Sequence, residues 1–293
     1  MAITTFENKV LKYHKLLLSN NLDDNGKVFA WACQNGHKEF AELLLTIKPT
    51  INISVNNDMA FKLACKNGHL NIAKWLLNMK PTIDIISEES NENDIAFTGA
   101  CKNGHLDIVE WLFTIDPNMY IYYYYNDEVF RLACENGHLN ITKWLFTINS
   151  TMDISADNNQ AFKLACKNGH INVAEWLLTI KPTINISADN DQIFIKACAN
   201  GHINIAKLLW NIKPSIDVNA KNDEAFRCAC ANGHLNIAEW LWSINPTIDI
   251  SANNEYAFRW ACTNGHKNIA EWLLTIRPTI NASIYMHMCA WLY

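Results

Sequence analysis

Eight pairs of one cysteine and one histidine are the residues of this chain whose types and spacing could do chemistry. In each pair three residues separate the two side chains, as in the stretch ACKNGHLNIAKWLL at residues 64–77. This spacing could supply half of a zinc site, or a thiol nucleophile beside its general base. The pairs are Cys33/His37, Cys65/His69, Cys101/His105, Cys134/His138, Cys166/His170, Cys198/His202, Cys230/His234 and Cys262/His266.

The eightfold repetition of the pair favours a structural role. Each pair offers at most two of the about four ligands that zinc needs, and an active site is normally one unique constellation. Stacked helices lie about 8–10 Å apart, which is too far for a disulfide between equivalent cysteines. We therefore expect each cysteine to be a small buried residue and each histidine to hydrogen-bond the backbone at a turn. The prediction is free thiols, no catalytic residue, no metal and no cofactor.

The elements that position these pairs are set by a repeat. The glycines that precede the eight histidines are separated by 32, 36, 33, 32, 32, 32 and 32 residues. A period of this size is typical of a solenoid, in which each unit buries its apolar face against its neighbours.

One unit can be followed from Asn57 onward. Asn57 is expected to be an N-cap, and an asparagine stands at the same place in all eight units. Phe61 and Cys65 are spaced for one face of a short helix, and Gly68 should end that helix in the left-handed conformation. A second helix follows, and Pro81 prevents its continuation. The unit is thus helix, tight turn, helix and extended arm.

These residues resemble the ankyrin repeat. The pattern AF-x-x-AC-x-NGH-x-x-IA-x-WLL occupies the places of the family's two helices, although Asn-x-x-Ala-Phe replaces the usual Thr-Pro-Leu-His start. A Pro-Thr-Ile segment stands where the family has its finger. The phrase WLL-x-I-x-P is similar to ankyrin arrays of large DNA viruses that infect amoebae. The resemblance implies an all-α, ankyrin-like α-solenoid of helix-turn-helix units with extended arms or short β-hairpin fingers.

The repeat divides the chain into three parts. Residues 1–24 are expected to be an N-terminal capping helix, and residues 284–293 an apolar C-terminal tail or cap. Residues 25–283 would hold eight ankyrin-like repeats. Their ranges are 25–56, 57–92, 93–125, 126–157, 158–189, 190–221, 222–253 and 254–283.

Candidate binding residues lie where the units differ. One arm is longer than the others and acidic, and the next arm is rich in tyrosine, a residue enriched in binding hot spots. A row of basic residues on the first helices, just after the phenylalanine and just after the cysteine, would lie beside these arms. The predicted partner-binding residues are Glu88, Glu89, Glu92, Tyr120, Tyr122, Tyr123, Tyr124, Tyr125, Lys102 and Arg131.

Tryptophan also recurs, at one position of the second helix in six units. It could pack at the edge of the core or form an aromatic docking stripe. The six residues are Trp75, Trp111, Trp144, Trp176, Trp240 and Trp272.

The bulk composition limits the function. The chain has 293 residues and a formal net charge of −5, which argues against nucleic acid as the main ligand. Neither a secretory signal nor an apolar run long enough for a membrane helix is found, so we expect a cytoplasmic, non-secreted monomer. The leading hypothesis is a non-catalytic protein–protein interaction module, viral in origin, that binds a host or viral protein. The alternatives are a substrate adaptor for a ubiquitin ligase and a structural virion component.

Overall fold

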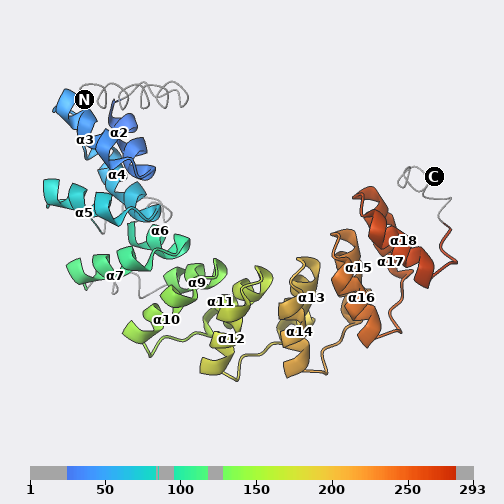
Figure 1. Cartoon of the computed structure of the whole chain (residues 1–293). Coiled ribbons are helices and arrows are strands. Elements are labelled where there is room, and N and C mark those ends of the chain that lie inside the picture. The colour runs from blue at the N-terminus through green and yellow to red at the C-terminus, as the bar shows by residue number, and fades with distance from the viewer. Residues whose placement is uncertain (1–24, 84, 86–95, 118–127, 282–293) are drawn as a thin grey trace, which may run out of the picture. The chain divides into compact units, whose positions relative to one another are not determined.

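The computed structural model describes residues 25–83, 85, 96–117 and 128–281. These residues form 16 helices and no strand, so the all-α solenoid predicted from the sequence is confirmed. The helices come in pairs, and Figure 1 shows the two helices of each pair side by side. The first helices are α2 (Asn25–Gln34), α4 (Val55–Lys66), α6 (Ala96–Asn103), α9 (Glu128–Glu135), α11 (Ala156–Lys167), α13 (Ala188–Ala199), α15 (Ala220–Ala231) and α17 (Ala252–Thr263). The second helices are α3 (Lys38–Ile47), α5 (Leu70–Met79), α7 (Leu106–Ile115), α10 (Leu139–Ile148), α12 (Ile171–Ile180), α14 (Ile203–Ile212), α16 (Leu235–Ile244) and α18 (Lys267–Ile276).

The chain divides into two compact units. One comprises residues 1–133 and 140–150, and the other residues 134–139 and 151–293. In the first unit α2 packs on α4 and α4 on α6. In the second unit α11, α13, α15 and α17 pack one on the next, and each also packs on the second helix of its own pair.

The turn between the two helices of a pair has the predicted backbone. The glycine of each Asn-Gly-His turn has a positive φ, between 76° and 88°. A side chain at such a position strains the backbone, whereas glycine adopts it readily. These glycines therefore end the first helices as the sequence predicts.

The core is built from the residues that recur. Seven phenylalanines of the first helices are at most 1% exposed, because the phenylalanine and the cysteine four residues later share one helical face. The tryptophan of a second helix then packs against the phenylalanine of the preceding pair. The ring centroids of Phe29 and Trp75 are 6.1 Å apart, as are those of Phe226 and Trp272. These two tryptophans thus pack at the edge of the core, as one of the two predictions for this position has it.

The start of the first helix differs from the prediction. The asparagine expected to be an N-cap has a positive φ in five pairs, at Asn57, Asn158, Asn190, Asn222 and Asn254. It belongs to a short left-handed turn, so the N-cap prediction is wrong at these positions. Asparagine tolerates this region better than most residues because its short polar side chain can bond locally. The same tolerance explains why asparagine recurs there.

The arms after the second helices consist of turns. The isoleucine of the Pro-Thr-Ile segment is buried in them, as at Ile83 and Ile184. Its backbone N–H donates to the carbonyl three residues earlier, that of Lys80 or Lys181, at 3.2 Å. No strand occurs in the described arms, which favours extended arms over β-hairpin fingers.

The left-handed turn of α15 contains a buried carboxylate, that of Asp223. Burying its negative charge is expected to lower the stability of the fold, which can be tested. Asp223 is 6% exposed, its Oδ2 accepts the backbone N–H of Asp249 at 3.2 Å, and its Oδ1 is buried without a described partner. Burial is the main cause that raises the pKa of Asp223. A raised pKa means that the charged form is less favourable in the folded chain than in the unfolded chain.

We expect Asp223→Asn to raise the stability at pH 7 by up to about 1 kcal/mol. The amide oxygen can still accept from Asp249, and asparagine already stands at the equivalent position as Asn159, which is also buried. The charge of Asp223 lowers the free energy of unfolding at pH values above the pKa that Asp223 has in the folded chain. This loss of stability disappears as the pH falls toward the ordinary aspartate pKa of about 3.9. Urea midpoints at pH 7 and pH 4 test this, and an advantage for asparagine that grows toward pH 4 would contradict it.

Candidate functional site

The cysteines of the Cys/His pairs are buried core residues. Of the ten cysteines in the sequence, eight are present as thiols, at Cys33, Cys65, Cys101, Cys134, Cys166, Cys198, Cys228 and Cys230. Burial raises the pKa of the Cys33 thiol to about 12 and raises that of Cys166 still further. A thiol with so high a pKa is not a nucleophile at neutral pH, because the thiolate is the reactive form.

One cysteine departs from the prediction of free thiols. Cys262 is disulfide-bonded, which corrects the prediction at that position. The remaining cysteine, Cys289, lies outside the described residues.

The histidines bond to the pair before their own. His69 Nε2 lies 3.0 Å from the carbonyl oxygen of Gln34, and His170 and His234 bond the backbone of Glu135 and Ala199. A carbonyl only accepts, so His69 must carry its proton on Nε2. Burial is the main cause that lowers the pKa of His170 and His234, which keeps both rings neutral at pH 7. The predicted backbone hydrogen bond is confirmed at these three histidines.

The asparagine of the Asn-Gly-His turn uses the same carbonyl in the second unit. Asn168 Nδ2 donates to the oxygen of Glu135 at 2.8 Å, and Asn232 Nδ2 donates to that of Ala199 at 2.7 Å. One carbonyl oxygen, placed just after the cysteine, therefore receives both side chains of the next turn. The imidazole is occupied in joining one pair to the next and is not placed as a base for the cysteine. Among the described residues no group of three histidine, cysteine or acidic side chains could hold a metal ion.

The predicted partner-binding residues are only partly described. Glu88, Glu89, Glu92 and the tyrosines Tyr120, Tyr122, Tyr123, Tyr124 and Tyr125 lie outside the described residues. Lys102 is near the end of α6 and Arg131 is in α9, and both side chains are half-buried. Each has interactions with its surroundings, and the structure places each on the first helix of its pair.

Two arginines of the basic row hold the chain's own backbone. The guanidinium of Arg227 donates to the carbonyl oxygens of Asn222 at 2.6 Å and Lys221 at 3.0 Å. Its carbon Cζ also lies 5.1 Å from the ring centroid of Tyr256. Arg259 binds the left-handed turn of α17 in the same manner. The basic row is therefore not one continuous surface open to a ligand, because these two members fasten left-handed turns.

Other lysines of the row line a pocket between α11 and α13. The pocket has a volume of about 190 Å³ and lies within the second unit. Its lining residues are Gln160, Lys163, Leu164, Lys167, Gln192, Ile193 and Lys196. The sequence analysis did not single out Lys196, which stands two residues after the recurring phenylalanine. It is the one charged residue at this position. The other pairs have Trp31, Leu63, Gly99, Leu132, Leu164, Cys228 and Trp260 there.

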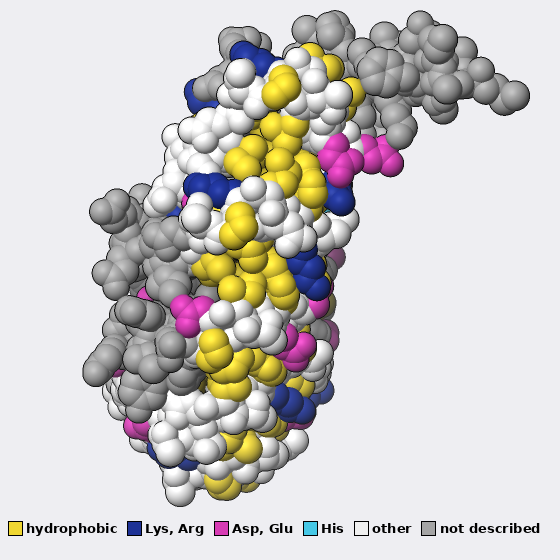
Figure 2. Space-filling model, turned by 90° about the vertical axis from the view of Figure 1, so that its left-hand side faces the viewer, with side chains coloured by type: hydrophobic (Ala, Val, Ile, Leu, Met, Phe, Trp, Pro, Cys, Tyr) yellow, Lys and Arg dark blue, Asp and Glu magenta, His cyan; other side chains and the backbone are white. Residues whose placement is uncertain are grey.

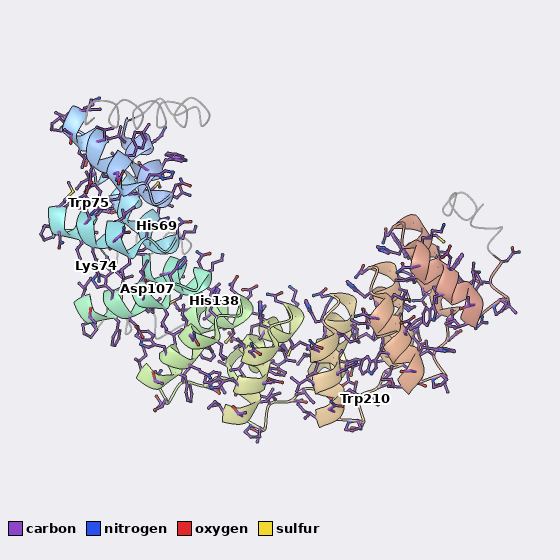
Figure 3. The ribbon with its side chains drawn as sticks, viewed as in Figure 1. His69, Lys74, Trp75, Asp107, His138 and Trp210 are labelled. Atoms are coloured by element: carbon purple, nitrogen blue, oxygen red, sulfur yellow. The ribbon has the colours of Figure 1, made fainter. Side chains whose placement is uncertain are left out.

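A second surface is apolar. Large hydrophobic side chains are exposed at the last residue of several second helices, and Figure 2 shows a hydrophobic band on the face that α3, α5 and α7 present. The exposed residues at this position are Ile47, Met79, Ile115, Ile180 and Ile212. Nearby lysines cover the tryptophans, since Lys74 Nζ lies 5.8 Å from the ring centroid of Trp111. Figure 3 shows His69 at the start of α5 and Lys74 and Trp75 farther along it.

Comparison with known protein families shows to which family this chain of helix pairs belongs. A model of ankyrin repeats in three copies matches residues 29–123, 97–190, 130–222 and 194–284. Because these matches together cover most of the chain, it belongs to the ankyrin repeat family. Ankyrin repeats indicate a protein–protein interaction module, and proteins of this kind are generally non-catalytic. A search of curated proteins gave no match to the chain. No described helix is long and apolar enough to cross a membrane.

Proposed function

We propose that this chain is a non-catalytic module that binds a protein partner through residues that differ between its helix pairs. The observation that supports the proposal is that the recurring side chains are used for packing, whereas the exposed side chains that vary between helix pairs are not. The recurring phenylalanine, cysteine, glycine, histidine and tryptophan are used in packing within and between pairs. The residues that vary are then available for recognition, which is where an ankyrin repeat protein can acquire its specificity.

The proposed partner surface combines the two irregular arms with the basic residues Lys102 and Arg131. It includes Glu88, Glu89 and Glu92 from the long arm and Tyr120 and Tyr122–125 from the tyrosine arm. Tyrosines would supply desolvated anchors, and the basic side chains would speed the encounter with an acidic partner.

The proposal also includes the division of the chain and its setting. Eight repeats over 25–283, a cap over 1–24 and a tail over 284–293 agree with the period of the sequence. We propose a monomer in the cytoplasm that does not bind nucleic acid, in line with the net charge of −5. The viral origin, and with it a host or viral protein as partner, rests on the phrase WLL-x-I-x-P alone.

Affinity capture with the full chain tests the proposed surface. Two double variants, Tyr122→Ala with Tyr124→Ala and Lys102→Glu with Arg131→Glu, are compared with the parent. Lys207→Glu, an exposed charge change on α14, is the control. One good anchor is worth about 2 kcal/mol, which is about 30-fold in affinity, so we expect the tyrosine variant, in which two tyrosines are removed, to lose at least that much affinity for the captured protein. Folded variants that both bind like the parent would place the partner surface elsewhere on the chain.

A further inference from the structure

The last residues of the second helices form an apolar row that remains exposed. In the first unit this row consists of Ile47, Met79 and Ile115, which are 67%, 45% and 39% exposed. Figure 2 shows a hydrophobic band on the face that these helices present. Contiguous exposed apolar surface is uncommon on proteins that act alone, and it marks an interaction site.

The second helices of the first unit follow one another in space as they do in the chain. Lys38 Nζ of α3 lies 5.8 Å from the ring centroid of Trp75 in α5, and α5 meets α7 through the lysine–tryptophan contact given above. The ring centroids of Phe113 in α7 and Trp144 in α10 are 5.3 Å apart. Packed helices lie about 8–10 Å apart, so the apolar row offers one side chain about every 10 Å.

The sign of the charge alternates from one of these helices to the next. Five residues before the last residue of each helix stands an exposed charged side chain, and the four are Glu42, Lys74, Glu110 and Lys143. α7 adds a second exposed acid, Asp107, and Figure 3 shows Lys74 and Asp107 on the two neighbouring helices. Glu42 also meets Lys38 of its own helix at 3.5 Å, but a carboxylate has room for a second cation. The face therefore has an alternating charge pattern beside its apolar row.

The spacing of the apolar row selects the conformation of a partner segment. An α-helix rises about 10.5 Å in seven residues and returns nearly to the same face. A helix that lies across α3, α5, α7 and α10 can therefore place one apolar side chain in each seven-residue repeat against the row. Residues on one face of a β-strand recur about every 6.6 Å or 13 Å, which does not match.

The alternating charges select the partner helix further. To meet opposite charges on all four helices, it needs Lys, Glu, Lys and Glu in successive seven-residue repeats beside its apolar residues. Laid in the reverse direction, the same helix would place like charges opposite one another. The pattern thus selects both the partner and its direction.

We propose that this face of α3, α5, α7 and α10 binds an amphipathic helix of a protein partner, with one apolar residue in each seven-residue repeat and flanking charges of alternating sign. The proposal rests on the proposed function, because its partner is a protein. It adds a surface on the second helices, separate from the irregular arms and from Lys102 and Arg131, which belong to first helices. The apolar row supplies the desolvated contact, and the charges supply the specificity.

Two synthetic peptides of identical composition test this proposal with the full chain. Each has four seven-residue repeats, with one leucine in every repeat and an alanine-rich background that favours a helix. The flanking charges run Lys, Glu, Lys, Glu in the alternating peptide and Lys, Lys, Glu, Glu in the block peptide. In titrations to about 1 mM at low salt, we expect the parent chain to bind the alternating peptide about 5-fold more tightly.

A charge exchange on the chain should reverse this preference. The double variant Lys74→Glu with Glu110→Lys keeps the net charge and gives the face two acids followed by two bases. The block peptide then opposes every charge, so we expect the variant to bind it about 5-fold more tightly than the alternating peptide. Unfolding curves of the variant and the parent show whether the fold is kept.

The apolar row is tested by a matched pair of double variants. Met79→Gln with Ile115→Gln should weaken binding of the alternating peptide about 10-fold. The control, Ile180→Gln with Ile212→Gln, changes exposed residues at the same helix position in the second unit. It should change the affinity less than about 2-fold, because the equivalent charges there end in two acids, Glu239 and Glu271.

Four results would overturn the assignment. They are no binding of either peptide, equal affinity of the parent for both peptides, no reversal in the folded charge-exchange variant, and equal weakening by the two glutamine variants. Tighter binding of a proline-rich peptide with leucine at every third residue would assign the face to a polyproline helix, which rises about 9.3 Å in three residues. If the peptides fail while the captured protein still depends on the arms, this proposal falls and the proposed function stands.

Discussion

Replacing Gly201 by alanine is expected to destabilise the fold by about 2–4 kcal/mol, whereas the same change at Gly265 should cost about 1 kcal/mol. Both glycines have a positive φ, of 84° and 76°, so both alanines are strained. At Gly201 an added Cβ would also lie 2.6 Å from Cε1 of His234. At Gly265 no described atom lies within 4 Å of the added Cβ.

The difference between the two variants measures the contact between helix pairs. His234 cannot move away without cost, because it bonds the backbone of Ala199. Urea denaturation followed by circular dichroism gives both free energies. Equal losses of unfolding free energy in the two variants would mean that backbone strain accounts for the whole effect. The ring of His234 would then move away from the added Cβ at little cost.

Replacing Phe226 by alanine is expected to cost about 3–5 kcal/mol, since it removes a large side chain from a fully buried site. Phe226 is 0% exposed and its ring packs against Trp272 of the next pair. The cavity would open between two pairs, so we expect the end of the array to separate in unfolding from the rest. Hydrogen exchange resolved along α15 to α18 would show this as a loss of protection confined to those helices.

The chain supplies a milder control for this prediction. Leu208 stands in α14 where Trp272 stands in α18, one pair after Phe162, which is also fully buried. Trp272→Leu should therefore cost less than Phe226→Ala, about 1–2 kcal/mol. A larger loss for Trp272→Leu than for Phe226→Ala would show that the phenylalanine is not the main anchor of the contact.

The helix pairs could be predicted because their signal is repeated and local. Phe61, Cys65 and Gly68 recur with their spacings, and periodicity within a helix does not depend on distant parts of the chain. The left-handed turn at the start of the first helix could not be predicted in the same way. Asn57 is as favourable at an N-cap as in the left-handed region, and only the backbone distinguishes the two.

The pocket was harder to predict for a different reason. Lys163 and Lys167 belong to the basic row visible in the sequence, but Lys196 comes from the next first helix and takes a position usually apolar. Their convergence depends on how α11 and α13 pack, which no short sequence window contains. The internal roles of Arg227 and Arg259 were hidden likewise, because their partners are backbone carbonyls. The role of the long acidic arm and of the tyrosine arm in partner binding remains a prediction from the sequence.

The joining of each turn to the turn before it has a consequence for how such a gene can change. Gly169, Gly201, Gly233 and Gly265 are spaced by 32 residues, and each histidine meets the glycine of the preceding pair. Removal of residues 190–221 would place Asn222 directly after Asp189 and bring His234 to Gly169 in place of His202. The new junction would repeat contacts that already exist. Recombination between repeats can therefore lengthen or shorten the protein by whole units, discarding or duplicating a recognition surface while every remaining interface stays of the same kind.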